Sequence, residues 1–103
     1  LLYDVIYHQE RDWGIIDLGC GDCCTLDFLA ASGFRNLHGI DLQLKSNSEN
    51  VAYTLYQGDL TKTPLVDNSI ELAVSISVIE HGVELPAFFA EVSRLLKTDG
   101  LLL

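Results

Sequence analysis

A glycine-rich turn between an apolar run and a helical stretch constrains this chain more than any other feature of its sequence. The run 14–18 (Gly-Ile-Ile-Asp-Leu) is typical of a buried strand, and Gly19 and Gly21 end it. A helix over 25–32 follows, and Gly33 stands where a left-handed C-terminal cap is expected. Because glycine has no Cβ, such a turn lets a ligand approach the backbone closely.

Short apolar runs alternate with helical stretches along the rest of the chain, which is typical of βαβ units and a parallel sheet. Further strands are predicted over 36–41, 51–57 and 70–76, and a fifth would start at 101–103. Residues 1–8 suggest the tail of a helix, and 43–50 suggest a short helix or a loop. A loop with Pro64 and a turn at 67–69 precede the fourth strand, and Pro86 opens a helix whose last turn contains Lys97, with Gly100 after its end. We therefore predict the α/β class, with a doubly wound, mostly parallel sheet.

Charge and size limit the partners of the chain. The 103 residues predict a single domain, and a net charge of −9 from 15 acidic and 6 basic residues argues against a nucleic-acid or anionic membrane surface. No apolar run is long enough to span a bilayer, and no signal peptide is recognisable. Three clustered cysteines do not make a disulfide framework, so a reducing, cytoplasmic location is expected.

Acidic residues stand at the ends of the first three predicted strands. Asp17 lies two residues before the first glycine of the turn, and Asp22 directly follows the second glycine. No Lys or Arg occurs between Asp12 and Phe34, so a pyrophosphate would face carboxylates with nothing to offset them. S-adenosylmethionine has a sulfonium and an ammonium and no phosphate, so this turn suits it better.

The next two strand ends add a ribose and an adenine candidate. Asp41 lies 20 residues after Gly21, the usual spacing for a carboxylate that accepts hydrogen bonds from ribose hydroxyls. Asp59, or the backbone beside it, could hold an adenine amino group where the third strand ends. Ligands of open α/β sheets bind at such carboxyl ends.

The ordered set of segments resembles the class I (Rossmann-like) S-adenosylmethionine-dependent methyltransferase superfamily, and in particular its small-molecule branch. The segments run from about Gly14 to the end of the chain, at 15–21, 39–41, 58–60, 71–75, 78–81 and 91–100. The resemblance implies that the glycines of the turn flank the methionine part of the cofactor, that Asp41 binds the ribose, and that the fourth strand end faces the methionine end. The cofactor contacts expected in this way are Asp17, Gly19, Cys20, Gly21, Asp41, Leu42, Asp59, Leu60, Ser75 and Ile76.

The chain departs from the family pattern in several places. Cys23 stands where the family commonly has a third glycine, Glu71 replaces an Asp, and 98–99 (Thr-Asp) replace Pro-Gly. The last two strands of the family are missing, so we expect residues 1–103 to form one cofactor-binding domain that is incomplete at its C-terminal end.

Several interpretations stay open at this stage. His81 is a candidate general base near the methyl-transfer face, or a residue that only packs or caps a helix. The cysteines Cys20, Cys23 and Cys24 suggest packing rather than a metal or redox cluster, and no metal is expected.

The leading function is methyl transfer to an O, N or C atom of a small-molecule acceptor, by a chain that can also form a homodimer. The alternatives are a nicotinamide-dependent oxidoreductase and a non-catalytic, methyltransferase-like binding or regulatory domain.

Overall fold

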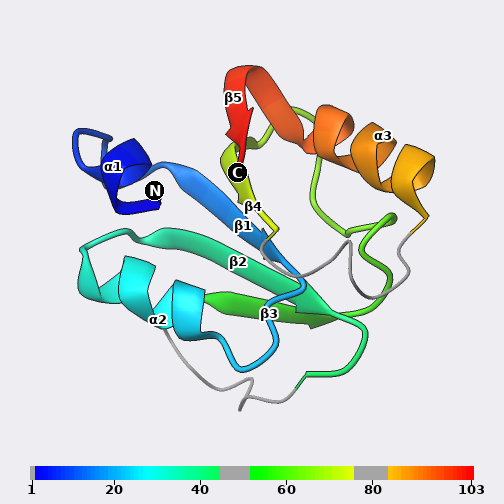
Figure 1. Ribbon diagram of the computed structural model, residues 1–103, viewed down its shortest axis with the longest axis horizontal. Coiled ribbons are helices and arrows are strands. Elements are labelled where there is room, and N and C mark those ends of the chain that lie inside the picture. Colours follow the sequence, from blue (N-terminus) through cyan, green and yellow to red (C-terminus); the bar gives the residue numbers. More distant parts are fainter. Residues whose placement is uncertain (1, 45–51, 76–83) are drawn as a thin grey trace.

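The computed structural model describes residues 2–44, 52–75 and 84–103. Its elements follow the chain in the order α1 (Leu2–Ile6), β1 (Gly14–Leu18), α2 (Cys24–Ala31), β2 (Asn36–Asp41), β3 (Thr54–Gln57), β4 (Ile70–Val74), α3 (Leu85–Leu95) and β5 (Leu96–Leu102). Figure 1 shows the strands side by side with the helices packed around them.

The five strands form one sheet in the order β3-β2-β1-β4-β5, and all four neighbouring pairs are parallel. The chain enters the sheet at its centre with β1, steps outward through β2 to β3, and crosses back to β4 and β5. The strand order therefore reverses between β1 and β4, and ligands of open α/β sheets bind beside the carboxyl ends at such a switch point. The prediction of a doubly wound, Rossmann-like parallel sheet is confirmed.

Apolar side chains cover both faces of the sheet. Ile15 belongs to a core cluster with Leu26 and Leu29 of α2, whereas the next residue, Ile16, belongs to a cluster with Phe88 of α3. Neighbouring strand residues point to opposite faces, so one run of apolar residues supplies both cores. The helices α1 and α2 thus cover one face and α3 covers the other (Figure 1).

Most predicted elements lie within a residue or two of the observed ones. The strands β1 and β2 have their predicted bounds, and Gly33 adopts a left-handed φ of 98° after α2. The strand β3 is shorter than the predicted 51–57, and residues 45–51 lie outside the described part of the chain. Pro86 lies in the first turn of α3 as expected, and the carboxylate of Glu84 accepts a hydrogen bond from the Ala87 N–H (3.1 Å) as the N-terminal cap.

The predicted end of α3 is wrong. Lys97 does not lie in its last turn, because α3 ends at Leu95 and β5 begins at Leu96. Leu96 of β5 pairs with Ile70 of β4, and the Lys97 ammonium lies 2.6 Å from a carboxylate oxygen of Glu71, which is also on β4. Pairing with β4 therefore replaces another helical turn. The register then shifts before β5 pairs with β4 again.

Candidate functional site

The turn after β1 folds over the end of β2. The N–H groups of Gly19 and Cys20 both donate to the carbonyl of Ile40, at 2.8 and 3.1 Å. Gly19 and Gly21 have φ values of 88° and 53°, a left-handed conformation that glycine adopts without steric cost. The two glycines are therefore needed for the chain to turn at this point.

Asp41 joins three strand ends. Its Oδ2 accepts from the Gly21 N–H (2.9 Å) and its Oδ1 from the Gln43 N–H (3.3 Å), while its carbonyl accepts from the Gly58 N–H (2.9 Å). One residue thus links the turn after β1, the end of β2 and the end of β3. This geometry fixes the position of the carboxylate at the carboxyl edge of the sheet.

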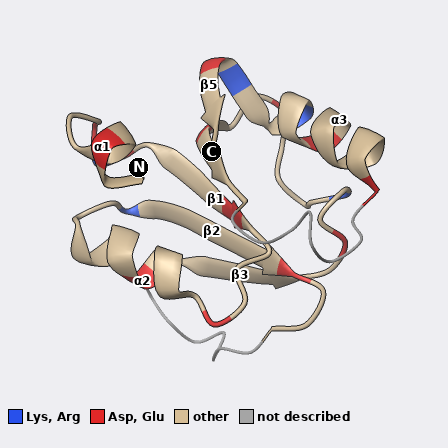
Figure 2. Ribbon diagram, viewed as in Figure 1, with Lys and Arg blue, Asp and Glu red and all other residues tan. Residues whose placement is uncertain are grey.

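Asp17 is buried in the same region. Only 4% of its surface is exposed, and burial, together with the negative charge of Asp41, raises its pKa from 3.8 to about 7. Burial, the neighbouring Cys23 thiol and these two carboxylates also raise the pKa of the Cys20 thiol to about 12. Figure 2 shows acidic segments at the carboxyl ends of β1 and β2. Over the ranges 2–44, 52–75 and 84–103, neither carboxylate has an ion pair with a basic residue.

Asp59 lies just beyond β3 and closes its own turn. Its Oδ1 accepts from the N–H (2.8 Å) and from the hydroxyl (2.7 Å) of Thr61, and these bonds lower the pKa of the carboxyl. Oδ2 takes part in neither bond. The next side chain, Leu60, is buried in the core beneath α3, so only its backbone can contribute to a site. Leu42, after β2, is exposed.

Ser75 follows β4 at the same edge of the sheet. Its N–H donates to the Leu103 carbonyl (3.0 Å), and its hydroxyl oxygen is buried without a hydrogen-bond partner among the described residues. A buried hydroxyl without a partner is uncommon, and this one can bond to a further polar group at the edge of the sheet. Ile76 and His81, the remaining predicted site residues, lie outside the described residues.

The glycines of this edge differ in their surroundings. A Cβ added at Gly21 or Gly58 would meet no atom within 4 Å, so the backbone at both positions faces open space. A Cβ on Gly39 would lie 2.6 Å from a methyl carbon of Leu26 and 3.0 Å from the Cβ of Cys20. A side chain at Gly39 would force Leu26 or Cys20 to shift, so the glycine lets the turn and α2 pack closely on β2, which the sequence pattern alone did not indicate.

Two of the three cysteines pack in the core beside the turn. Cys20 and Cys23 are buried, Cys24 is exposed, and all three are free thiols. Cys23 has a φ of 70°, which is strained for a residue with a side chain. Within the described ranges, no three His, Cys, Asp or Glu side chains are grouped closely enough to hold a metal ion. In the same part of the chain, no helix has the length and apolar composition needed to cross a bilayer.

Comparison with known proteins identifies the family. Residues 16–103 match the model of the methyltransferase domain family, and the chain therefore belongs to that family.

Among curated proteins, the chain is 26% identical over 111 residues to a probable S-adenosylmethionine-dependent methyltransferase of Mycolicibacterium smegmatis. This alignment covers 100% of this chain and 41% of the relative. It is 36% identical over 90 residues to the ribosomal RNA-processing protein 8 of Mus musculus. That alignment covers 85% of this chain and 17% of the mouse protein. The chain therefore spans less than half the length of either relative.

A solved structure confirms the fold. The phosphoethanolamine N-methyltransferase 2 of Haemonchus contortus, in complex with S-adenosyl-L-methionine, superposes with a TM-score of 0.80 at 19% sequence identity, covering 98% of this chain and 25% of that one. At this identity the likeness supports the fold of the chain alone, which is the Rossmann-like methyltransferase fold.

Proposed function

We propose that the carboxyl edge of the sheet binds S-adenosylmethionine and that the protein transfers its methyl group to an acceptor. The observation that carries this proposal is the pair of carboxylates, Asp17 and Asp41, held together at the switch point without a basic partner among the described residues. Bringing two uncompensated carboxylates together is costly, and a cationic ligand offsets that cost. A pyrophosphate would increase it.

The residues present fit this cofactor part by part. Asp41, fixed by the Gly21 and Gln43 N–H groups, retains acceptor capacity for the ribose hydroxyls. Asp59 and the backbone of Leu60 would receive the adenine at the end of β3. Asp17 and the Ser75 hydroxyl, which has no partner among the residues that the structure describes, would lie on the methionine side.

Two further features support the fit. The open space at Gly21 and Gly58 lets a ligand approach the backbone of both turns. The backbone of the turn itself, at Gly19 and Cys20, is fixed by its two bonds to Ile40, so little ordering is required on binding.

The cofactor supplies a methyl group already activated by its sulfonium: the acceptor nucleophile forms the new bond to carbon, sulfur keeps the electron pair of the broken bond, and the acceptor releases a proton. The described residues bind and orient the donor for this step. Alignment of donor and acceptor supplies much of the rate in such a reaction.

We infer a small molecule as the acceptor. The net charge of −9 disfavours a nucleic acid, and the names of two similar proteins point to small acceptors: the sterol 24-C-methyltransferase of Pneumocystis carinii and the phosphoethanolamine N-methyltransferase 2 of Haemonchus contortus. The name of the mouse relative points instead to ribosomal RNA. Three free cysteines, two of them buried, further support a reducing compartment such as the cytoplasm.

Calorimetric titration with S-adenosylhomocysteine and with NAD tests this proposal. We expect S-adenosylhomocysteine to bind and to raise the melting temperature, because a ligand of the native state stabilises it by mass action. NAD should bind far more weakly. A folded protein that binds NAD more tightly, or neither ligand at millimolar concentration, would contradict the proposal.

A further inference from the structure

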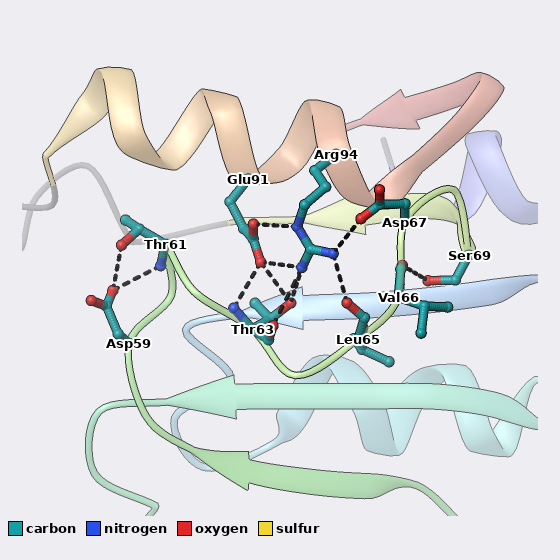
Figure 3. A network of polar contacts seen from close by, with 9 residues as sticks. All are labelled: Asp59, Thr61, Thr63, Leu65, Val66, Asp67, Ser69, Glu91 and Arg94. Atoms are coloured by element: carbon teal, nitrogen blue, oxygen red, sulfur yellow. Dashed lines mark hydrogen bonds and ion pairs between the residues drawn. The ribbon is translucent and has the colours of Figure 1, made fainter.

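The segment that leads from β3 to β4 is held by two side chains of α3. Its Thr63 donates from both the backbone N–H (2.7 Å) and the hydroxyl (2.8 Å) to Oε2 of Glu91 (Figure 3). Glu91 is only 7% exposed, although it is charged. A carboxylate buried to this degree must have its acceptor sites filled, and a donor 28 residues away in sequence fills one of them.

Arg94 completes the contact between α3 and the segment. Its guanidinium donates to both oxygens of Glu91 (Nε to Oε1 at 2.7 Å, Nη2 to Oε2 at 2.6 Å), and it reaches the Leu65 carbonyl and the Asp67 carboxylate, both at 2.8 Å. The bonds from Arg94 lower the pKa of Glu91, so its carboxylate stays charged. We call Glu91, Arg94 and Thr63 the α3 clamp.

The α3 clamp lies close in sequence to the proposed adenine contacts. Thr63 follows Asp59 by four residues, and the bonds from Thr61 and from the Lys62 N–H to Asp59 fold the residues between them into a turn. On its apolar side, Leu60 packs in one cluster with residues of α3. The stretch from 59 to 63 therefore has its polar end and its apolar side both fixed by the same helix.

We propose that Glu91, held by Arg94, is a positioning residue that sets the 59–60 stretch for recognition of the adenine amino group. This inference rests on the proposed function, since it requires that the adenine binds at that stretch. Glu91 acts through Thr63 and does not touch the cofactor itself. Recognition of one amino group depends on placing acceptors to within a few tenths of an ångström, which a turn closed only by its own short-range bonds does not ensure.

The test compares two ligands that differ only at the amino group. S-adenosylhomocysteine and its 6-deamino analogue, in which a hydrogen replaces the adenine amino group and the purine ring is otherwise unchanged, are titrated by calorimetry, and the ratio of their affinities is the amino-group preference. Thr63→Val removes the hydroxyl bond to Glu91 and the longer bond that the hydroxyl accepts from Arg94 Nη2 (3.3 Å), with little change of shape, and it keeps the backbone bond to Glu91. We expect the preference to fall by roughly three- to tenfold, the effect of one weakened hydrogen bond.

Matched variants separate positioning from stability. Thr63→Ser restores the hydroxyl and should restore the preference of the wild type. Lys97→Gln breaks the ion pair with Glu71 elsewhere on β4 and β5, so it should leave the preference unchanged. Glu91→Ala is too disruptive for this purpose, because it leaves the buried donors of Thr63 and Arg94 without their acceptor. If Glu91→Ala fails to fold, the milder Thr63→Val still tests the inference.

Each outcome bears on the inference. A preference that is unchanged in Thr63→Val, whatever its melting temperature, would overturn the positioning role while leaving the proposed function intact. A wild type that binds both ligands equally would overturn the adenine assignment of the 59–60 stretch. A wild type that binds neither ligand would refute the proposed function, and this inference with it.

Discussion

Two groups of acidic residues in this protein differ in whether a basic residue faces them. On the side of α3, β4 and β5, three acids are bonded to basic residues: Glu71 to Lys97, and both Glu91 and Asp67 to Arg94. At the carboxyl edge of the sheet, Asp17, Asp41 and Asp59 have no ion pair within the described ranges. Figure 2 shows basic segments in α3 and β5 and acidic ones at the ends of β1 and β2.

The two regions also differ in whether the pKa of a buried carboxyl group is raised or lowered by its surroundings. Arg94 lowers the pKa of Glu91 although the side chain is buried, so this carboxylate is charged and structural. Burial and Asp41 raise the pKa of Asp17 to about 7, so its charge is costly as long as no cation faces it. The comparison indicates that these acids on the α3 side stabilise the fold, whereas the acids at the edge contribute no ion pair within the described residues, as the proposed binding of a cationic cofactor requires.

The largest effect should come from breaking the compensated region. Glu91→Ala leaves Thr63 and the guanidinium of Arg94 without their main partner, so we expect a loss of about 2–4 kcal/mol in the free energy of unfolding. Urea denaturation measures it. Lys97→Ala breaks a more exposed pair and should cost no more than about 1 kcal/mol. Equal losses in the two variants would contradict the structural role given to Glu91.

At the edge, a substitution should affect binding more than stability. We expect Asp41→Ala to weaken S-adenosylhomocysteine binding by about 1–3 kcal/mol, through lost bonds to the ribose and through the Gly21 N–H that loses its acceptor. Calorimetric titration measures this loss. Asp99→Ala, which removes an exposed acid of β5, is the control and should bind as the wild type does. An affinity unchanged by Asp41→Ala, with stability collapsed, would refute the ribose assignment.

The raised pKa of Asp17 predicts a pH dependence of stability. Between about pH 4 and pH 7 the native state binds more protons than the unfolded state does, because the native pKa is near 7 and the ordinary value is 3.8. The contribution of this group to the free energy of unfolding is therefore present below pH 4 and is lost as the pH rises through 7.

Asp17→Asn should remove this dependence. At pH 8 we expect the variant to be more stable than the wild type, since it has no buried charge, and we expect the two to differ least near pH 4. Denaturation curves at several pH values, compared between the two proteins, measure the difference. A wild type that gains stability relative to the variant as the pH rises from 4 to 7 would show that the pKa of Asp17 is not raised.

The smallest effect concerns the strained residue of the turn. Cys23 has a left-handed φ of 70°, so Cys23→Gly should give a more stable protein than Cys23→Ala by about 1 kcal/mol. Both variants lose the buried thiol, so their difference isolates the backbone strain. Thermal denaturation measures it, and an alanine variant at least as stable as the glycine variant would contradict the strained conformation.

Local sequence patterns predict the elements whose conformation depends mainly on residues close together in the chain. The apolar runs of β1 and β2 and the glycines that end them predict both strands and the turn, and the spacing of Asp41 places it at the same edge. The end of α3 could not be predicted in this way, because Leu96 leaves the helix to pair with a strand distant in sequence.

The contacts that sequence reasoning missed are also long-range. The need for glycine at Gly39 depends on Leu26 and Cys20, and the burial of Glu91 depends on Thr63, 28 residues away. Opposite charges three residues apart on a helix, as in Glu91 and Arg94, were the one available signal for this pair, and most such pairs lie on exposed surfaces.

The central claim, that the edge retains negative charge for a cationic ligand, is tested most directly by Asp17→Asn. Wild type and variant are titrated with S-adenosylmethionine and with NAD at one ionic strength and at pH 8, where the Asp17 carboxylate is charged. The substitution nearly preserves shape and removes one charge, so we expect weaker binding of S-adenosylmethionine and unchanged or slightly stronger binding of NAD. A variant that loses affinity for both ligands equally, or a wild type that prefers NAD, would contradict the claim.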